Sequence, residues 1–243
     1  MPQAPPIEKE SRIEKISTLV SRSKTSKVQK QPLIDWPAAV KPLIKKYAKT
    51  KHPLEAENLY QMLVMVVLAA QTTDKVVNLI APDLFKAFPG MASLAKATPE
   101  KLQPLISKIR NSRNKAGWLI KIASKVKKDA AIPLTIEALV QLPGIGRKSA
   151  NVIKLFAGAE IEGVMVDLHT VRVSNRLGIA TSDDPKKIEQ QIMQQLPKKE
   201  WEAGMSMSFL GREICRPKPL CPECLMRPVC AYYNQWAVSK TEV

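Results

Sequence analysis

Two side chains in this sequence could together carry out covalent chemistry: Lys148 and Asp167. Lys148 falls in the first turn of a helix predicted from Arg147 onward, where the positive end of the helix dipole favours loss of a proton from an ammonium group. A neutral amine is a nucleophile. Asp167 stands at the predicted N-cap of the next helix, where a carboxylate could stabilise a sugar carbon that turns positive as the amine attacks. The simpler interpretations are a solvated surface lysine and an ordinary helix cap.

A glycine-containing turn precedes Lys148. The segment Leu142-Pro143-Gly144-Ile145-Gly146 lies between two helical patterns, which predicts a helix, a tight hairpin and a second helix over 135–157. The free amides at the start of the second helix form a site for a phosphate oxygen, and Arg147 adds positive charge beside it. Such a contact positions a protein on a nucleic acid without reading its bases. An ordinary helix connector could show the same glycine spacing.

Four cysteines, Cys215, Cys221, Cys224 and Cys230, lie close together near the C-terminus. Four thiolates in one loop segment describe a closed metal site, and their spacing is compatible with zinc and with an iron–sulfur cluster. Disulfides are the less favoured interpretation in a chain with no visible export signal.

The charge of the chain indicates a polyanionic partner. Its 243 residues include 38 Lys and Arg against 22 Asp and Glu, a formal net charge of +16. Nucleic acid is favoured over an anionic membrane, because no basic amphipathic helix or lipidation motif is present. The charge does not indicate what happens to the partner.

The sequence also argues against membrane and secreted classes. The longest apolar run, Met62–Ala70, is far shorter than the ~18–20 residues of a membrane span. The N-terminal segment contains Glu8, Glu10 and Glu14 and has no apolar stretch typical of a signal peptide. We therefore expect a cytoplasmic, nucleoid-associated protein without a membrane partner.

The elements that position these residues are predicted to be helices throughout, so the expected fold class is all-α. Apolar residues recur at spacings of three and four, and no alternating stretch predicts a strand. Prolines fall between the helices or in their first turns, Pro82 included. Residues 1–31 are polar and basic, which predicts a flexible tail. The predicted helices are Ala38–Tyr47, Ala56–Ala70, Lys75–Phe88, Pro99–Ile109, Lys115–Val126, Thr135–Leu142, Arg147–Ala157, Leu168–Leu177, Pro185–Leu196 and Glu200–Gly211.

Taken in order, the motifs resemble those of the endonuclease III family of helix–hairpin–helix DNA glycosylases. The matching stretches are Leu-Pro-Gly-Ile-Gly-Arg-Lys-Ser-Ala-Asn from Leu142, Val-Asp-Leu-His-Thr-Val-Arg-Val from Val166, and the cysteine cluster. The resemblance runs from about Leu54 to Tyr233.

The resemblance implies roles for individual residues. Lys148 would be the nucleophile that attacks C1′ of a damaged nucleotide, and Asp167 would assist it. The four cysteines would bind a structural [4Fe–4S] cluster, with zinc as the alternative. Gln71, in Leu-Ala-Ala-Gln-Thr-Thr-Asp, would fill the gap left by the flipped base. The expected DNA contacts are Gln71, Asn111, Leu142, Gly144, Gly146, Arg147 and His169.

The same resemblance implies two helical domains that flank a DNA-binding cleft. A six-helix barrel domain with the helix–hairpin–helix at 135–157 would span 51–160, and an iron–sulfur cluster domain would combine 32–50 with 161–243. The implied partner is double-stranded DNA with damaged bases or abasic sites, bound by a monomer.

The implied activity is that of a base-excision-repair glycosylase with AP lyase activity, which removes oxidised pyrimidines through a lysine Schiff base. The alternatives are a mismatch- or uracil-directed glycosylase of the same superfamily and a non-catalytic helix–hairpin–helix DNA-binding protein. The superfamily's monofunctional mismatch enzymes typically lack the lysine, and a pure binder needs neither Lys148 nor Asp167 in these positions.

Three positions depart from the family's pattern. Five residues separate Cys215 from Cys221 where six are usual, which bears on the identity and stability of the cluster. Polar Asn111 or Ser112 stands where an apolar residue is usually wedged into the base stack, which bears on damage preference and opposite-base recognition. Ser149 replaces a common threonine.

Overall fold

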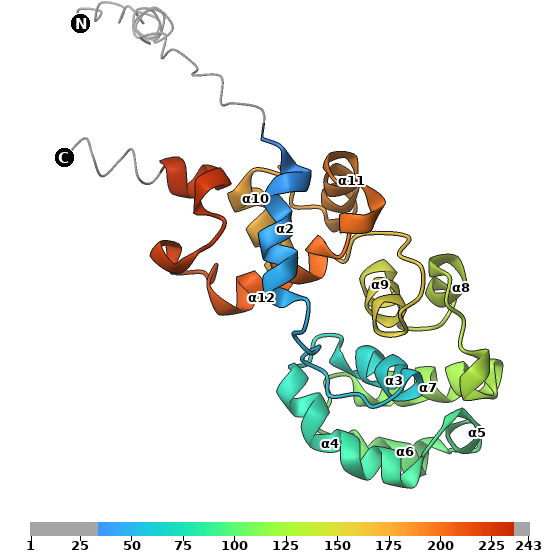
Figure 1. The fold of residues 1–243 in the computed structure, drawn as a ribbon. Coiled ribbons are helices and arrows are strands. Elements are labelled where there is room, and N and C mark those ends of the chain that lie inside the picture. The colour runs from blue at the N-terminus through green and yellow to red at the C-terminus, as the bar shows by residue number, and fades with distance from the viewer. Residues whose placement is uncertain (1–33, 236–243) are drawn as a thin grey trace, which may run out of the picture. The chain divides into compact units, whose positions relative to one another are not determined.

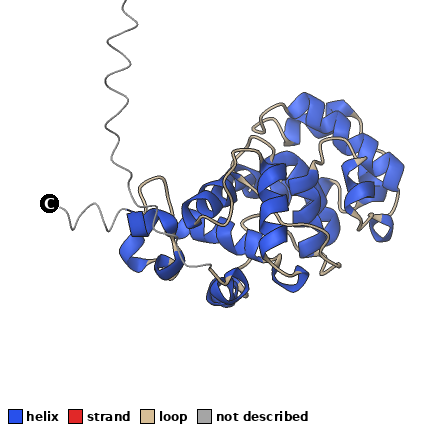
Figure 2. Cartoon of the chain, turned by 90° about the horizontal axis from the view of Figure 1, so that it is seen from above, coloured by secondary structure: helices blue, strands red, loops and turns tan. Residues whose placement is uncertain are grey.

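The computed structural model describes residues 34–235, and every regular element in that range is a helix (Figures 1 and 2). The expected all-α class is confirmed. The basic tail predicted for residues 1–31 lies outside the described residues. None of the described helices combines the length and the apolar character needed to cross a membrane.

Short connections join the helices, which Figure 1 labels where there is room. The α-helices are α2 (Trp36–Tyr47), α3 (Leu59–Ala69), α4 (Asp74–Ala87), α5 (Met91–Leu94), α6 (Pro99–Leu105), α7 (Ser112–Val126), α8 (Ile136–Val140), α9 (Arg147–Phe156), α10 (Leu168–Leu177), α11 (Pro185–Gln195) and α12 (Ala203–Glu213). The short 3-10 helices are η2 (Asp129–Ala131), η3 (Lys198–Glu200), η4 (Cys221–Glu223) and η5 (Arg227–Val229). A last helical segment, 231–235, reaches the end of the described range.

Capping side chains decide where several helices begin. The apolar pattern predicts Ala56–Ala70, but α3 begins at Leu59 because Asn58 accepts a hydrogen bond from the amide of Gln61 at 2.9 Å. Asp184 caps α11 in the same way. These side chains satisfy amides that have no partner inside the helix, so the cap sets the boundary and the apolar spacing does not.

Two other expectations are wrong for reasons of local structure. The predicted helix Pro99–Ile109 ends at Leu105, and Ile106 and Ile109 are buried in the turns that follow. Because these two side chains are three residues apart, they imitate the helical spacing. Pro82 lies in the interior of α4, where the helix continues with one backbone hydrogen bond fewer.

The remaining differences concern helix starts and short elements: α2 begins at Trp36 and α7 at Ser112, ahead of the predicted Ala38 and Lys115. The four-residue helix α5 is too short to show a period, so the sequence did not predict it. The segment predicted as a helix from Glu200 to Gly211 divides into the end of η3 and α12.

Buried apolar side chains of the described residues form two hydrophobic clusters. The first runs mainly through 54–153 and surrounds α3, which is apolar on nearly all sides and contacts α4, α7 and α9. The second joins 36–47 to 164–230, and in Figure 1 α2, near the start of the chain, lies against α12, near its end. The division into 51–160 and 32–50 plus 161–243 stays a prediction that this pattern supports.

Candidate active site

Lys148 and Asp167 line one open pocket of about 1710 Å³. Lys148 is an exposed residue in the first turn of α9, and Asp167 is the N-cap of α10. The connection between α2 and α3, the turn between α3 and α4 and part of α12 also contribute to the walls. Among the described residues, none forms a hydrogen bond or an ion pair with the Lys148 amine. The amine therefore faces the pocket without a partner.

Hydrogen bonds hold the Asp167 carboxylate in place. Oδ1 accepts from the Thr170 amide at 2.8 Å and from its hydroxyl at 3.0 Å, and Oδ2 accepts from the Ser208 hydroxyl at 2.7 Å. Burial alone would raise the pKa of Asp167, but the hydrogen bonds from Thr170 and Ser208 outweigh it, so the pKa lies below its ordinary value of 3.8. Asp167 is therefore ionised at neutral pH and suited to stabilise positive charge in the pocket.

Arg212 of α12 brings two carboxylates together at this site. Its guanidinium lies 3.0 Å from Asp74 Oδ2 and 3.8 Å from Asp167 Oδ2. His169, in the first turn of α10, lines the same pocket, and its Nδ1 lies 3.1 Å from a guanidinium nitrogen of Arg172. Burial lowers the pKa of His169, and nearby Asp167 only partly offsets this, so the ring is neutral at neutral pH.

The two hairpin glycines have different surroundings. Gly144 has a φ of 79° in the left-handed region, and a Cβ on it would lie 2.6 Å from the Trp118 ring. Gly146 has a φ of −96°, and a Cβ there would have no heavy atom within 4 Å. Leu142 is buried in the first hydrophobic cluster, so only its backbone can face a ligand. The open space at Gly146 is where another molecule could approach the amides of α9.

A buried carboxylate holds Arg147 and the segment before Asp167. Glu189 Oε2 accepts from Arg147 Nε at 2.5 Å, while its Oε1 accepts from the side-chain amide of Asn151 at 3.3 Å and from the Val164 amide at 3.1 Å. A Cβ on Gly163 would lie 2.1 Å from the same carboxylate. The Arg147 side chain is therefore bound to Glu189 of α11. Through its several hydrogen bonds, Glu189 also fixes the start of α9 relative to the segment that leads into α10.

Two turns with left-handed backbones carry the residues expected to fill the base stack. Gln71 has a φ of 58° and Asn111 a φ of 59°, and both are exposed. Lys115, with 2% of its surface exposed, donates from Nζ to the carbonyls of Leu68 at 2.8 Å and Ala70 at 2.5 Å. It thereby ties α7 to the end of α3. Gln71 lines the pocket of Lys148, whereas Asn111 does not.

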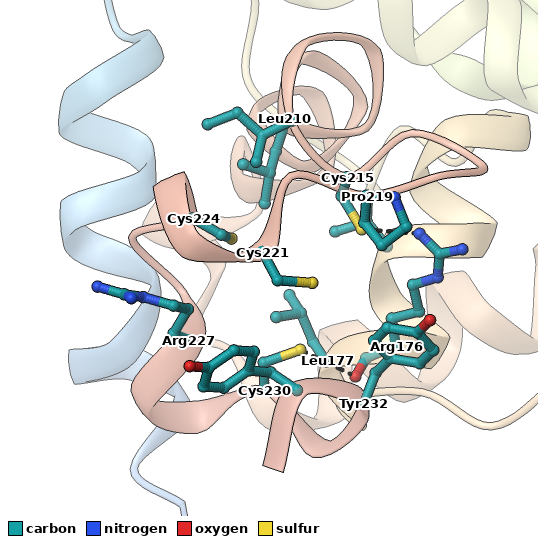
Figure 3. A pocket seen from close by; sticks show the side chains of 13 residues that line it. Arg176, Leu177, Leu210, Cys215, Pro219, Cys221, Cys224, Arg227, Cys230 and Tyr232 are labelled. Atoms are coloured by element: carbon teal, nitrogen blue, oxygen red, sulfur yellow. Dashed lines mark hydrogen bonds between the residues drawn. The ribbon is translucent and has the colours of Figure 1, made fainter. Parts of the chain in front are cut away.

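The four cysteines line a different pocket, between their loop and helices α10 and α12 (Figure 3). Arg176 of α10 donates to Cys215 Sγ at 3.4 Å and to the carbonyls of Arg216 at 2.7 Å and Pro217 at 3.0 Å. The short stretch between Cys215 and Cys221 is thus anchored on α10. In the described part of the chain, no three His, Cys, Asp or Glu side chains are grouped as ligands of a single metal ion.

Several residues that shape the active-site pocket had no role in the sequence analysis. Ser208 and Arg212 reach Asp167 from α12, and Glu189 reaches Arg147 from α11. These contacts span 41 residues in one case and 42 in another, so no local spacing reveals them. Asp74 is the only one of these pocket residues that belongs to a sequence motif, because it ends the stretch Leu-Ala-Ala-Gln-Thr-Thr-Asp that begins at Leu68.

Known proteins are similar to this chain in sequence and in fold. The family model of the HhH-GPD superfamily of base excision DNA repair proteins matches residues 64–198. Endonuclease III of Synechocystis sp. is 35% identical over 192 residues, which cover 77% of this chain and 88% of the relative. Endonuclease III of Thermotoga maritima is 34% identical over 180 residues, which cover 72% of this chain and 84% of that protein.

Solved structures extend this similarity. A trapped endonuclease III–DNA covalent intermediate matches with a TM-score of 0.74 and 31% identity, over 84% of this chain and 99% of that one. A non-covalent endonuclease III–DNA complex matches with the same TM-score and identity, over 85% and 99% of the two chains. A thermostable thymine-DNA glycosylase, 22% identical with a TM-score of 0.71 over 83% and 97% of the chains, shares the fold.

Proposed function

This chain belongs to the endonuclease III family, within the HhH-GPD superfamily of base excision DNA repair proteins, and on that premise we propose that it removes oxidised pyrimidines from duplex DNA through Lys148. It is a base-excision DNA glycosylase that binds DNA, and AP lyase activity is typical of its family. One observation carries the proposal for the site: an unpartnered lysine amine and an ionised carboxylate line the same pocket.

The reaction begins with a nucleotide turned out of the duplex, because a base inside the stack is out of reach of the pocket. Gln71, on its exposed left-handed turn, would fill the space that the base leaves. The hairpin at Gly144 and Gly146 would hold a phosphate on the free amides of α9. Turning the base out costs a few kcal/mol, least for a damaged or mispaired base.

Lys148 then displaces the base. Once the amine has given up its proton, it forms a bond to C1′ while the bond from C1′ to the base nitrogen breaks, and the base leaves with the electron pair and takes up a proton. Asp167 stabilises the positive charge that develops on the sugar, since its lowered pKa keeps it ionised. Opening of the sugar ring gives a Schiff base with Lys148. Loss of a C2′ proton and departure of the 3′ phosphate then cut the strand.

We expect Lys148→Gln to separate catalysis from binding. Without the amine, base release should fall by about a hundredfold or more, and no covalent adduct should be trapped with borohydride. Affinity for the same duplex should change little, because one of many positive charges is lost. Single-turnover cleavage, borohydride trapping and a binding titration measure the three quantities.

Lys125→Gln is the matched control for this experiment, since it removes an exposed lysine charge from α7 away from the pocket. It should retain full activity. A Lys148→Gln protein that still forms the adduct at the rate of the unaltered protein would exclude Lys148 as the nucleophile.

The choice of substrate is tested with a panel of duplexes that contain an oxidised pyrimidine, uracil, a mismatch or an abasic site. We expect the oxidised pyrimidine and the abasic site to be processed fastest. Fastest release of uracil or of a mispaired base would favour the mismatch-directed alternative. Tight binding without cleavage of any duplex would favour a non-catalytic binder.

We also propose that the four cysteines hold a [4Fe–4S] cluster, which when bound would crosslink the C-terminal loop and take no part in the reaction. All four side chains surround one space, and four thiolates supply one ligand for each iron. Arg176 supports the loop on which these ligands stand.

The purified protein should therefore be brown, with broad visible absorbance and about four iron atoms per chain. Cys224→Ser should lose most of this absorbance. A colourless protein that contains one zinc would establish the zinc alternative.

Finally, we propose that the protein acts as a monomer at the nucleoid, where its DNA substrate lies.

A further inference from the structure

His52 lines the pocket of Lys148 and Asp167, yet the mechanism above gives it no part. It lies in the connection between α2 and α3. Its Nδ1 is 3.1 Å from the amide of Leu54, and a backbone amide can only donate. A neutral His52 ring therefore carries its proton on Nε2, which makes that nitrogen a hydrogen-bond donor.

The backbone around His52 is firmly held. Leu54 is buried in the first hydrophobic cluster. Asn78 of α4 donates from its side-chain amide to the carbonyl of Pro53 at 2.9 Å and accepts from the amide of Glu55 at 3.1 Å. Because these contacts fix the chain that follows His52, and the Leu54 amide holds Nδ1, the ring presents its Nε2 donor in one position.

Burial, assisted by two nearby cations, keeps the His52 ring neutral. Burial lowers the pKa of His52 to about 4, and the Lys148 ammonium adds to the effect. Four charged groups from four helices act on it: Lys148 of α9, Asp74 of α4, Arg212 of α12 and Asp167 of α10. Asp74 and Asp167 raise the pKa of His52, but Asp74 is paired with Arg212 and Asp167 is bound by Thr170 and Ser208, so the two carboxylates only partly offset the effect of burial.

We propose that His52 is a specificity-determining residue whose Nε2–H donates a hydrogen bond to a carbonyl oxygen of the extruded base. This inference rests on the proposed function. Pyrimidine lesions that keep a ring carbonyl offer such an acceptor, and a flipped base is read through hydrogen bonds to its edge. A neutral donor suits this place, because a cation would oppose the positive charge that develops on the nearby sugar.

Two substitutions separate this role from a structural one. In His52→Asn, the side-chain oxygen can take over the acceptor for the Leu54 amide, but no donor remains at the place of Nε2. In His52→Gln, the longer amide can restore the donor. Both proteins are compared with the unaltered one in single-turnover assays, on one duplex with an oxidised pyrimidine and on the same duplex with a preformed abasic site.

We expect His52→Asn to slow base release about tenfold to a hundredfold, which is the effect of one lost hydrogen bond to a buried acceptor. Cleavage at the preformed abasic site should change by less than about twofold, because no base is present. His52→Gln should recover a large part of base release. Thermal unfolding of all three proteins verifies that the substitutions leave the fold intact.

Two results would overturn the inference. If His52→Asn releases the base as fast as the unaltered protein, Nε2 makes no contact that matters to the rate. If both substrates slow equally, the ring supports the sugar, the phosphate or the fold and not the base. Failure of the proposed function is a separate result, since the unaltered protein would then release no oxidised pyrimidine at all.

Discussion

At the scale of single residues, Asp167 combines two tasks that the sequence presented as alternatives. It caps α10 through the Thr170 amide, and it faces the pocket beside Lys148. Because its hydrogen bonds lower its pKa, it is a weak base and a good electrostatic partner for a cation. The arrangement favours stabilisation of the sugar's positive charge over removal of a proton from Lys148.

Asp167→Asn is expected to preserve the cap and remove the charge. Asn is as good an N-cap as Asp, so the free energy of unfolding should fall by no more than about 1–2 kcal/mol. Base release should fall by about tenfold to a thousandfold, because the developing charge loses its partner. The control is Asp184→Asn, which makes the same change at the exposed cap of α11 and should leave the rate unchanged.

A comparison of Asp167→Asn with the unaltered protein also tests the lowered pKa of Asp167. A carboxylate whose pKa is lower in the folded protein contributes stability above its unfolded pKa of about 3.9 and loses it as the pH falls through the folded value. The difference in unfolding free energy between the unaltered protein and Asp167→Asn should therefore be constant above about pH 5 and shrink below pH 4. A constant difference down to pH 2 would contradict the lowered pKa.

Residue types and spacing were enough to single out Lys148 and Asp167, and they did not reveal what surrounds them. Ser208 and Arg212 stand on α12, far along the chain, and reach the site only after α10 and α12 pack together. His52 is a lone histidine in a connection with no motif around it. Such side chains become visible only when the fold brings distant segments into one pocket.

At the scale of elements, the hairpin between α8 and α9 contains one glycine that the fold requires and one that it does not. Gly144 has a left-handed backbone and packs against Trp118, whereas Gly146 borders open space. The sequence treats the two glycines alike. Their surroundings therefore differ: Gly144 is required by the backbone and its packing, and we expect the space at Gly146 to admit a ligand.

Gly144→Ala should destabilise the protein by about 1–3 kcal/mol, because the new Cβ strains the backbone and meets the Trp118 ring. Gly146→Ala should leave the unfolding temperature nearly unchanged and weaken DNA binding, because its Cβ would occupy the approach of a phosphate. Thermal unfolding and a duplex-binding titration measure both effects. Unaltered DNA affinity of a folded Gly146→Ala protein would mean that no phosphate approaches this turn.

The apolar pattern predicted most of the longer helices but not their ends. Helix α3 starts where Asn58 caps it, and α6 stops while buried Ile106 and Ile109 continue the helical spacing in turns. Burial and helical geometry produce the same spacing over one turn, so a sequence alone does not distinguish them there. The capping residues and turns in the structure show where each helix begins and ends.

At the scale of the whole molecule, the charge of +16 should govern how the protein holds DNA. The slope of log K against log salt should approach −0.9 for each phosphate neutralised on duplex DNA. Arg110 is an exposed residue whose amide donates to the Thr72 hydroxyl at the edge of the active-site pocket. Arg110→Gln should reduce the slope by about one, whereas Lys125→Gln should leave it unchanged.

Binding titrations at several salt concentrations between about 50 and 200 mM measure this slope for each protein, because contacts with phosphates dominate the salt dependence. Equal slopes for Arg110→Gln and the unaltered protein would place the DNA away from the turn between α6 and α7. The net charge was visible in the sequence, but the part of it that faces the pocket depends on how α7 packs against α3.

The buried Glu189 carboxylate constrains how this sequence can change over time. Arg147, Asn151 and the Val164 amide all bind it, and Gly163 has no room for any side chain beside it. Loss of Arg147 leaves the buried Glu189 carboxylate without its ion-pair partner, and a side chain at Gly163 collides with that carboxylate, so the effects of two substitutions in this cluster will not add. We therefore expect single substitutions in this cluster to be poorly tolerated. Sequence change here requires compensating substitutions in helices that are neighbours only in the folded chain.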